Sequence, residues 1–197
     1  MEKERRDLLK AALDEFSEVG LTASSLESIA KRADLEPSVA RALFVDKQRL
    51  LGAVLKESTE PLVSAIGMAV EKVQDPRELM SKSLRLLDQW LLENPKYVRL
   101  FQHGALEKAS TIGSLYQHSF FPSEYYERVQ EHLDRGELRG GDPFMVFLLL
   151  DSLVLFSHMM RPALELMCSN ETSEQLFERR FDAIMDVLEH GLYSTRK

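Results

Sequence analysis

The sequence predicts an all-α fold of about nine helices. The chain is 44% hydrophobic and 29% charged, and its abundant Leu, Ala, Glu, Lys and Arg favour helix over sheet. Apolar residues recur at steps of three and four, as in Leu9, Ala12, Leu13 and Phe16, which is the spacing of one helix face. No strand-like alternation of useful length occurs, so we expect no substantial sheet.

Capping residues mark the helix starts along the chain. The capping-box pairs are Ser24 with Glu27 and Thr172 with Gln175, and the caps that precede a proline are Asp75, Asn94 and Asp142. The expected helices span residues 4–19, 25–32, 36–43, 46–73, 76–93, 95–104, 123–136, 143–166 and 173–193. Pro61 lies inside the fourth of these and is expected to kink or split it, because proline removes a backbone donor. Residues 105–122 fit helix ambiguously, and the three glycines within residues 135–141 predict a turn.

Composition also indicates the compartment. Cys168 is the single cysteine, which excludes an intrachain disulfide and a cysteine-rich zinc site. The N-terminus mixes acids with bases and lacks the apolar segment of a signal peptide. Residues 144–160 are apolar, but they are shorter than the roughly 20 residues of a membrane span and contain Asp151. We therefore expect a cytoplasmic protein with no membrane partner, in which this stretch is a buried interface helix.

Charge and motifs argue against an enzyme. The net charge of −7 opposes loose attraction of the whole molecule to polyanions, whereas residues 1–56 carry ten basic and ten acidic side chains. No phosphate loop, dinucleotide fingerprint or nucleophile elbow occurs. The histidines lie far apart and form no i, i+4 pair of the kind a helical zinc site favours. We expect no catalytic residues, no metal and no cofactor.

The first three expected helices predict a compact N-terminal module. Helices this short must pack on one another to be stable. The pair at residues 25–32 and 36–43 has the helix-turn-helix arrangement, in which the second helix is offered to a DNA major groove. The sequence thus divides into a module at residues 1–56 and a larger domain at residues 57–197. The expected core of the module is Leu9, Ala12, Leu13, Phe16, Leu26, Ile29, Ala30, Ala33, Leu35, Leu43 and Phe44.

This module resembles the N-terminal signature of the TetR family of transcriptional regulators. The run LLKAALDEFSEVGLTASSLESIAKRADL, followed by LF and DKQRLL, has Ala and Phe on the first helix, Gly at its end and Ile-Ala on the second. Two departures stand in the helix-turn-helix: Asp34 replaces the usual Gly, and Arg41 occupies a Tyr position. Asp adopts the left-handed backbone conformation better than most residues, so we expect the turn to persist.

The resemblance implies a ligand-responsive transcriptional repressor that binds a palindromic double-stranded DNA operator as a homodimer. It implies phosphate contacts at Ser25, Arg41 and Lys47, base contacts at Ser38 and Val39, and a place for Glu36 on the same surface. In a plainer interpretation, Ser25 is only a helix cap and Lys47 a solvated charge. The acidic residues beside the second helix support an alternative function, a TetR-fold dimeric ligand-binding or protein-interaction module with weakened or lost DNA binding.

The larger domain is expected to dimerise and to bind a small apolar or aromatic effector. A helix that is apolar nearly all round needs cover from several sides, and a second subunit can supply it; the other interpretation is a monomer that buries these faces internally. The expected interface residues are Leu148, Ser152, Leu155, Phe156, Met159, Phe177, Phe181, Ile184 and Leu188. The expected pocket lining is Trp90, Phe101, His103, Tyr116, Phe120, Tyr125 and Phe147, although each of these residues also fits an ordinary core.

Overall fold

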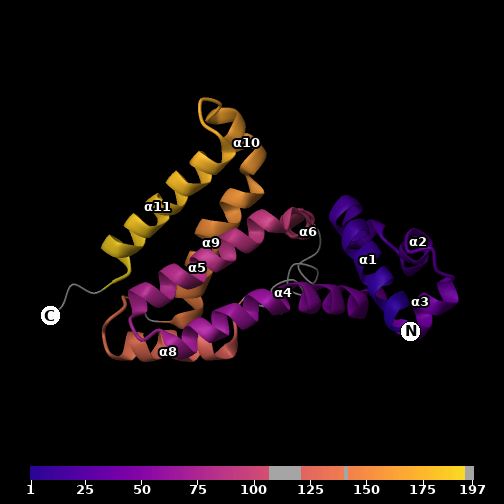
Figure 1. Ribbon diagram of the computed structural model, residues 1–197, viewed down its shortest axis with the longest axis horizontal. Helices are drawn as coiled ribbons and strands as arrows, with labels where there is room; N and C mark the ends of the chain where they lie inside the picture. The colour runs from indigo at the N-terminus through magenta and orange to yellow at the C-terminus, as the bar shows by residue number, and fades with distance from the viewer. Residues whose placement is uncertain (107–120, 140–141, 194–197) are drawn as a thin grey trace. The chain divides into compact units, whose positions relative to one another are not determined.

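The computed structural model describes residues 1–106, 121–139 and 142–193 (Figure 1). These residues form ten α-helices and no β-strand, apart from an isolated antiparallel bridge between Leu138 and Tyr193. The all-α prediction is confirmed. The helices are α1 (Glu2–Ala23), α2 (Leu26–Arg32), α3 (Pro37–Leu43), α4 (Lys47–Lys72), α5 (Pro76–Glu93), α6 (Pro95–Leu106), α8 (Ser123–Asp134), α9 (Pro143–Met159), α10 (Arg161–Met167) and α11 (Ser173–Gly191).

Two compact units divide the chain within α4. The N-terminal unit comprises Met1–Pro61 together with α6, and the C-terminal unit comprises Leu62–Glu93 together with α8 to α11. The sequence-based boundary at residue 56 lies one and a half helical turns before Pro61 and stays a prediction. One helix, α4, therefore contributes residues to both units.

The N-terminal unit is built on α1. Leu8, Phe16, Ile29 and Leu50 are buried between its helices. Gly20 interrupts the helical backbone of α1 with φ of 81°, a conformation in which any other residue would be strained. The glycine expected at the end of the first helix thus marks a real break, although helical structure resumes as far as Ala23.

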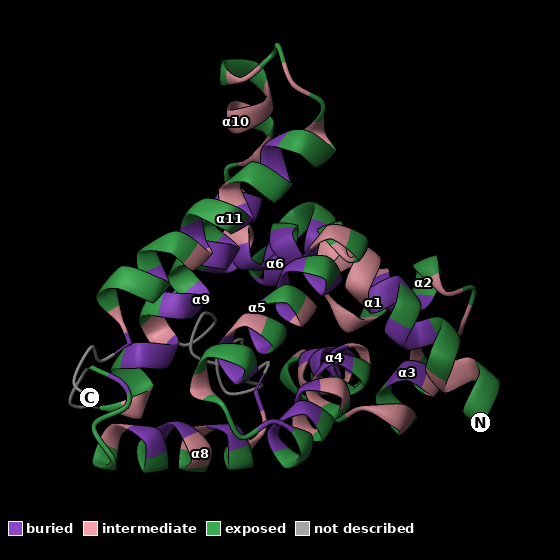
Figure 2. Cartoon of the chain, turned by 60° about the vertical axis from the view of Figure 1, so that its left-hand side comes forward, coloured by how far each residue is buried: buried purple, intermediate pink, exposed green. Residues whose placement is uncertain are grey.

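The C-terminal unit contains the helices with the clearest caps. The Asp142 side chain accepts a hydrogen bond from the backbone of Phe144 at 2.8 Å, and Thr172 forms a capping box with Gln175. Both predicted starts are confirmed. Gly136 has φ of 70°, as expected for a turn after α8. Along α9 and α11 buried and exposed residues alternate around each helix (Figure 2).

Two backbone predictions differ from the structure. The helix expected over residues 143–166 is bent by 67° between α9 and α10, because Pro162 in the first turn of α10 starts a new helix instead of continuing the old one. At Pro61 the expected split does not occur, because α4 runs unbroken from Lys47 to Lys72, and a kink there stays a prediction. Pro61 is exposed, so water can satisfy the carbonyl that its missing N–H leaves free.

Membrane-spanning character is weak in the described ranges. No single helix there is both long and apolar enough to cross a bilayer, and only the bent pair of α9 and α10 meets the length and composition of a span.

Candidate functional site

The helix-turn-helix consists of α2, a tight turn and α3. Asp34 sits in the turn with φ of 56°, so the expectation that aspartate would tolerate the left-handed conformation is confirmed. The amide of Leu35 donates to the carbonyl of Ala30 at 2.9 Å, which closes the end of α2. The turn therefore holds α3 in place without the usual glycine.

The N-terminus of α2 is capped by Ser25. Its hydroxyl oxygen accepts from the amide of Ser28 at 3.0 Å, and the Ser28 hydroxyl accepts from the amide of Ser25 at 3.0 Å. The capping box therefore begins one residue later than the expected Ser24, whose hydroxyl instead donates to the carbonyl of Leu21 at 2.8 Å. Ser25 is partly exposed, and its contact with a phosphate stays a prediction.

The solvent side of α3 carries most of the residues predicted to face DNA. Ser38 and Arg41 are exposed, Val39 is half-buried, and Ala40 packs in the core. Glu36 is the exposed N-cap of α3, and its carboxylate makes no capping hydrogen bond. The face that a major groove would meet thus presents a hydroxyl, a guanidinium and one carboxylate.

Arg41 is paired across the helix-turn-helix. Its guanidinium donates to the Glu27 carboxylate at 2.8 Å, and the side chains of both residues are more than half exposed. An ion pair this exposed contributes little stability, so a phosphate can replace Glu27 as the partner of Arg41. Sequence reasoning did not find this role of Glu27, because only the fold brings together residues fourteen positions apart.

Lys47 performs a structural task at the start of α4. Its amino group donates to the backbone carbonyls of Leu21 at 2.5 Å and Ser24 at 2.9 Å. These carbonyls lie at the C-terminal end of α1, which has no further helical turn to satisfy them. Lys47 thus joins α4 to α1, and any phosphate contact would have to share the same ammonium group.

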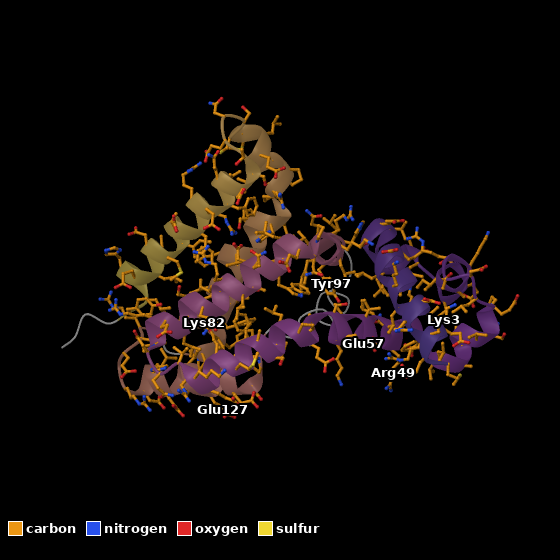
Figure 3. The ribbon with its side chains drawn as sticks, viewed as in Figure 1. Lys3, Arg49, Glu57, Lys82, Tyr97 and Glu127 are labelled. Carbon is orange, nitrogen blue, oxygen red and sulfur yellow. The ribbon has the colours of Figure 1, made fainter. Side chains whose placement is uncertain are left out.

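Two further cations belong to the same unit. Lys31 on α2 and Arg49 on α4 (Figure 3) are exposed and make no ion pair within the part of the chain that the structure describes. The sequence prediction named neither residue as a DNA contact. Both are free to meet a polyanion.

The residues predicted to line a ligand pocket fall into separate groups. Trp90, Tyr125 and Phe147 are buried in the C-terminal unit, whereas Phe101 is buried and His103 half-buried in the N-terminal unit. The predicted lining residues Tyr116 and Phe120 lie outside the described residues. The structure therefore gathers only part of the predicted set.

An aromatic cluster lies around Phe147 in the C-terminal unit. The Phe121 ring lies 4.6 Å from Tyr125 and 5.2 Å from Phe147, between ring centroids, and the Tyr126 ring lies 5.3 Å from Phe147. The Tyr125 hydroxyl donates to the sulfur of Met80 on α5 at 3.2 Å, and burial raises the pKa of Tyr125. Phe121 and Tyr126 were absent from the predicted lining, although their sequence proximity to Tyr125 was a usable signal.

A buried ionic cluster joins α5, α9 and α11. The Asp88 carboxylate accepts from Nε2 of His158 at 2.7 Å and also from Arg180. Burial raises the pKa of Asp88, but these hydrogen bonds and the Arg180 charge outweigh burial and lower its pKa below the ordinary value. Burial lowers the pKa of His158, and Asp88 offsets only part of this. His158 is thus a neutral donor in the folded chain near neutral pH.

The predicted dimer residues separate by burial. Leu155, Phe177, Phe181, Ile184 and Leu188 are buried within the single chain, so these residues fill the core of the subunit and do not line an open surface. The helices α9 and α11 pack on their own chain by these apolar faces, and a contact of these five residues with a partner stays a prediction. Of the remaining predicted residues, Leu148 and Met159 are half-buried, whereas Ser152 and Phe156 are exposed.

A continuous exposed face remains on α9. We call it the α9 stripe, and its residues repeat at helical spacing, so they lie along one side of the helix. The α9 stripe consists of Met145, Leu149, Ser152, Leu153, Phe156 and Met160. Leu149 is 62% and Phe156 is 63% exposed, and contiguous apolar surface is typical of sites where proteins interact.

The fold is that of the TetR-type transcription regulators. A TetR family transcription regulator from Marinobacter aquaeolei VT8 superposes with a TM-score of 0.67 at 22% identity, covering 94% of this chain and 95% of that one. The fatty acid degradation regulator FadR from Bacillus halodurans superposes with a TM-score of 0.70 at 17% identity, covering 95% of each chain. The fold predicted from the N-terminal resemblance is therefore confirmed, and both of these neighbours are named as regulators.

One curated relative is similar to part of the chain. The HTH-type transcriptional regulator BetI from Klebsiella pneumoniae (strain 342) is 36% identical over 62 residues, which is 32% of this chain and 32% of that protein. The chain thus aligns with about a third of the relative's length. No protein-family model matches the chain.

Proposed function

We propose that the chain is a transcription regulator that acts in the cytoplasm as a homodimer and binds a palindromic DNA operator. The observation that carries the proposal is the intact helix-turn-helix, whose α3 presents Ser38 and Arg41 to solvent within a fold shared with transcription regulators. A single α-helix fits the major groove of B-DNA, and α3 is the helix that this arrangement offers.

The DNA contacts follow from the exposed side chains of the N-terminal unit. Arg41 exchanges Glu27 for a phosphate, and Lys31 and Arg49 add charge that sequence reasoning had not assigned. Ser38 and Val39 meet base edges. The Ser25 hydroxyl and the Lys47 amino group already form hydrogen bonds within the unit. Their contribution to phosphate binding is therefore smaller than that of a free side chain.

The α9 stripe supports the dimer. Two-fold pairing of this stripe buries Leu149 and Phe156 of both subunits, and the exposed Val187 of α11 extends the surface. A two-fold dimer presents two copies of α3, which matches the symmetry of a palindromic operator.

Effector binding is assigned to the C-terminal unit, where the predicted lining residues Trp90, Tyr125 and Phe147 are buried. The continuous helix α4 belongs to both units, so a shift of its C-terminal half moves the unit that carries α3. An effector that favours one position of α4 thereby changes operator affinity. We assign the chain the role of a repressor, which leaves its DNA operator when the effector binds.

A second candidate function is a ligand-binding or protein-interaction dimer that has lost operator binding. Two observations favour it: Glu27 neutralises Arg41, and the amino group of Lys47 is already engaged with carbonyls. Both reduce the positive charge that a DNA-binding surface needs.

Selection of genomic fragments tests the proposal. The purified protein is incubated with sheared DNA of its source organism at low salt, and the bound fragments are sequenced. We expect enrichment of a small set of fragments that share an inverted repeat. Uniform recovery of all fragments, or recovery of none, would contradict operator binding and favour the second function.

Two matched arginine variants locate the surface. Arg41 and Arg85 each form an exposed ion pair at 2.8 Å, with Glu27 and Glu178 respectively, but only Arg41 lies on α3. Loss of one charged phosphate contact is worth about 1.5–3 kcal/mol, so Arg41→Ala is expected to weaken binding to a selected fragment at least about 10-fold. Arg85→Ala should leave the affinity unchanged, and equal effects of the two variants would exclude α3 as the contact.

A further inference from the structure

Asp151 is an acidic residue within the otherwise apolar helix α9. Asp151 is only 1% exposed, and its Oδ1 atom has no hydrogen-bond partner among the described residues. The other buried carboxylate, that of Asp88, is shared by His158 and Arg180. Asp151 therefore differs from Asp88 in lacking a cationic partner among the described residues.

Asp151 lies about two helical turns before His158, so both side chains lie on the face of α9 that meets α5. Helices α5 and α9 run in the same direction, because Met80 of α5 and Phe147 of α9 both contact the start of α8, while Asp88 bonds His158 further along. Asp151 lies about 10.5 Å along α9 before His158, at the level of the part of α5 between Met80 and Asp88.

Ser83 of α5 is fully buried, and its hydroxyl faces the Tyr125 hydroxyl of α8, so of these two groups the Asp151 Oδ1 atom is the one without a polar partner among the described residues. Buried polar groups in folded proteins are satisfied in the great majority of cases. The unpaired Oδ1 of Asp151 therefore points to a missing polar partner. A molecule that donates a hydrogen bond suits it, since an ionised carboxylate can only accept.

Aromatic rings lie next to this level. Phe147 precedes Asp151 by one turn on the same helix and contacts Phe121 and Tyr126. Aromatic faces attract cations as well as apolar groups. The surroundings therefore suit a molecule with a positive head and an apolar or aromatic body.

Burial without a partner raises the pKa of Asp151 to about 7. A cation brought next to it would restore the ionised form, because an opposite charge favours the carboxylate. A second copy of the chain cannot supply that cation, since Asp151 is covered by its own subunit. A small molecule that enters the unit can.

We propose that Asp151 is the charge-recognising residue of an effector site formed by α5, α8 and α9, and that the effector carries a protonated amine on an apolar or aromatic body. The ammonium group donates to the Asp151 carboxylate, while the body packs on the rings near Phe147. The inference rests on the proposed function in that it assigns this molecule as the effector.

Three matched probes test the site without DNA. The full-length protein is titrated calorimetrically at pH 7.5 with 4-phenylbutylammonium, 4-phenyl-1-butanol and 4-phenylbutanoate, which share one body and differ in the head group. We expect the ammonium to bind at least about 10-fold more tightly than the alcohol, and the carboxylate to bind most weakly. Equal affinities, a preference for the carboxylate, or no binding of any probe would overturn the proposal.

Two aspartate variants assign the preference to one residue. Asp151→Asn should reduce the affinity for the ammonium probe at least about 10-fold and leave the alcohol unchanged, whereas Asp7→Asn, the same change at an exposed position of α1, should alter neither. An ammonium preference that survives Asp151→Asn would refute the role of Asp151. The comparison of the probes on the unaltered chain stands even if Asp151→Asn does not fold.

The outcomes also separate this inference from the proposed function. Ammonium binding in a protein that selects no DNA fragment would leave the site in place and remove the regulator. Selection of DNA fragments by a protein that shows no preference among the probes would keep the regulator and remove the ammonium site.

Discussion

Phe156→Asp is expected to convert the dimer into monomers at micromolar concentration. Phe156 is 63% exposed at the middle of the α9 stripe, and burial of one phenylalanine side chain is worth about 1.5–3 kcal/mol. Two-fold symmetry changes two such residues at once and places two like charges near each other. The dimer dissociation constant should therefore rise at least about 1,000-fold, corresponding to about 4 kcal/mol.

Sedimentation equilibrium measures this shift directly. The matched control is Val45→Asp, which places the same charge at a residue that is 87% exposed in the N-terminal unit and should leave the dimer intact. Because Phe156 contributes little to the core of its own subunit, the variant should keep its helical circular dichroism. A dimer of unchanged strength in Phe156→Asp would exclude the α9 stripe as the interface.

Asp88→Ala is expected to cause the largest loss of subunit stability. The variant leaves the Arg180 charge without its carboxylate partner and removes the acceptor of His158, both inside the C-terminal unit. Removal of one partner from a buried ion pair costs about 3–5 kcal/mol. The loss should appear as a lower free energy of unfolding in urea at pH 7.

The pH dependence of this difference follows from the lowered pKa of Asp88. A carboxylate whose pKa is lower in the folded state stabilises the fold above its ordinary value of 3.8, and this stabilisation is lost as the pH falls through the folded value. The gap between the two proteins should therefore be full at pH 7 and shrink below about pH 4.

The control for Asp88→Ala is Asp182→Ala, an exposed position on α11 that should change stability by less than about 0.5 kcal/mol. A loss of similarly small size in Asp88→Ala would contradict the view that the ionic cluster holds α5, α9 and α11 together.

Local signals in the sequence predicted the elements well. Thr172 and Asp142 cap their helices as expected, since a cap depends on side chains within three residues of it. Asp34 takes the expected left-handed conformation. The bend before Pro162 was missed because the apolar pattern continued past it, although the proline itself was a stop signal.

Contacts between residues that lie far apart in the chain could not be predicted from the sequence. The apolar pattern of α9 and α11 indicates that both helices are buried, but it does not say which face their own chain covers. Phe177 and Phe181 are therefore covered by their own chain, whereas Phe156 is left exposed. The engagement of Lys47 with α1 and of Arg41 with Glu27 depends on the packed unit, which no residue spacing reveals.

If two copies of α3 bind DNA together, binding to one selected fragment must depend steeply on salt and involve two subunits. Fluorescence anisotropy gives the affinity between 50 and 200 mM salt, and sedimentation of the complex gives its stoichiometry. Two subunits per fragment are expected, with an affinity that falls at least about 100-fold over this range, because each phosphate contact releases counterions. One subunit per fragment, or an affinity that salt does not change, would contradict the claim.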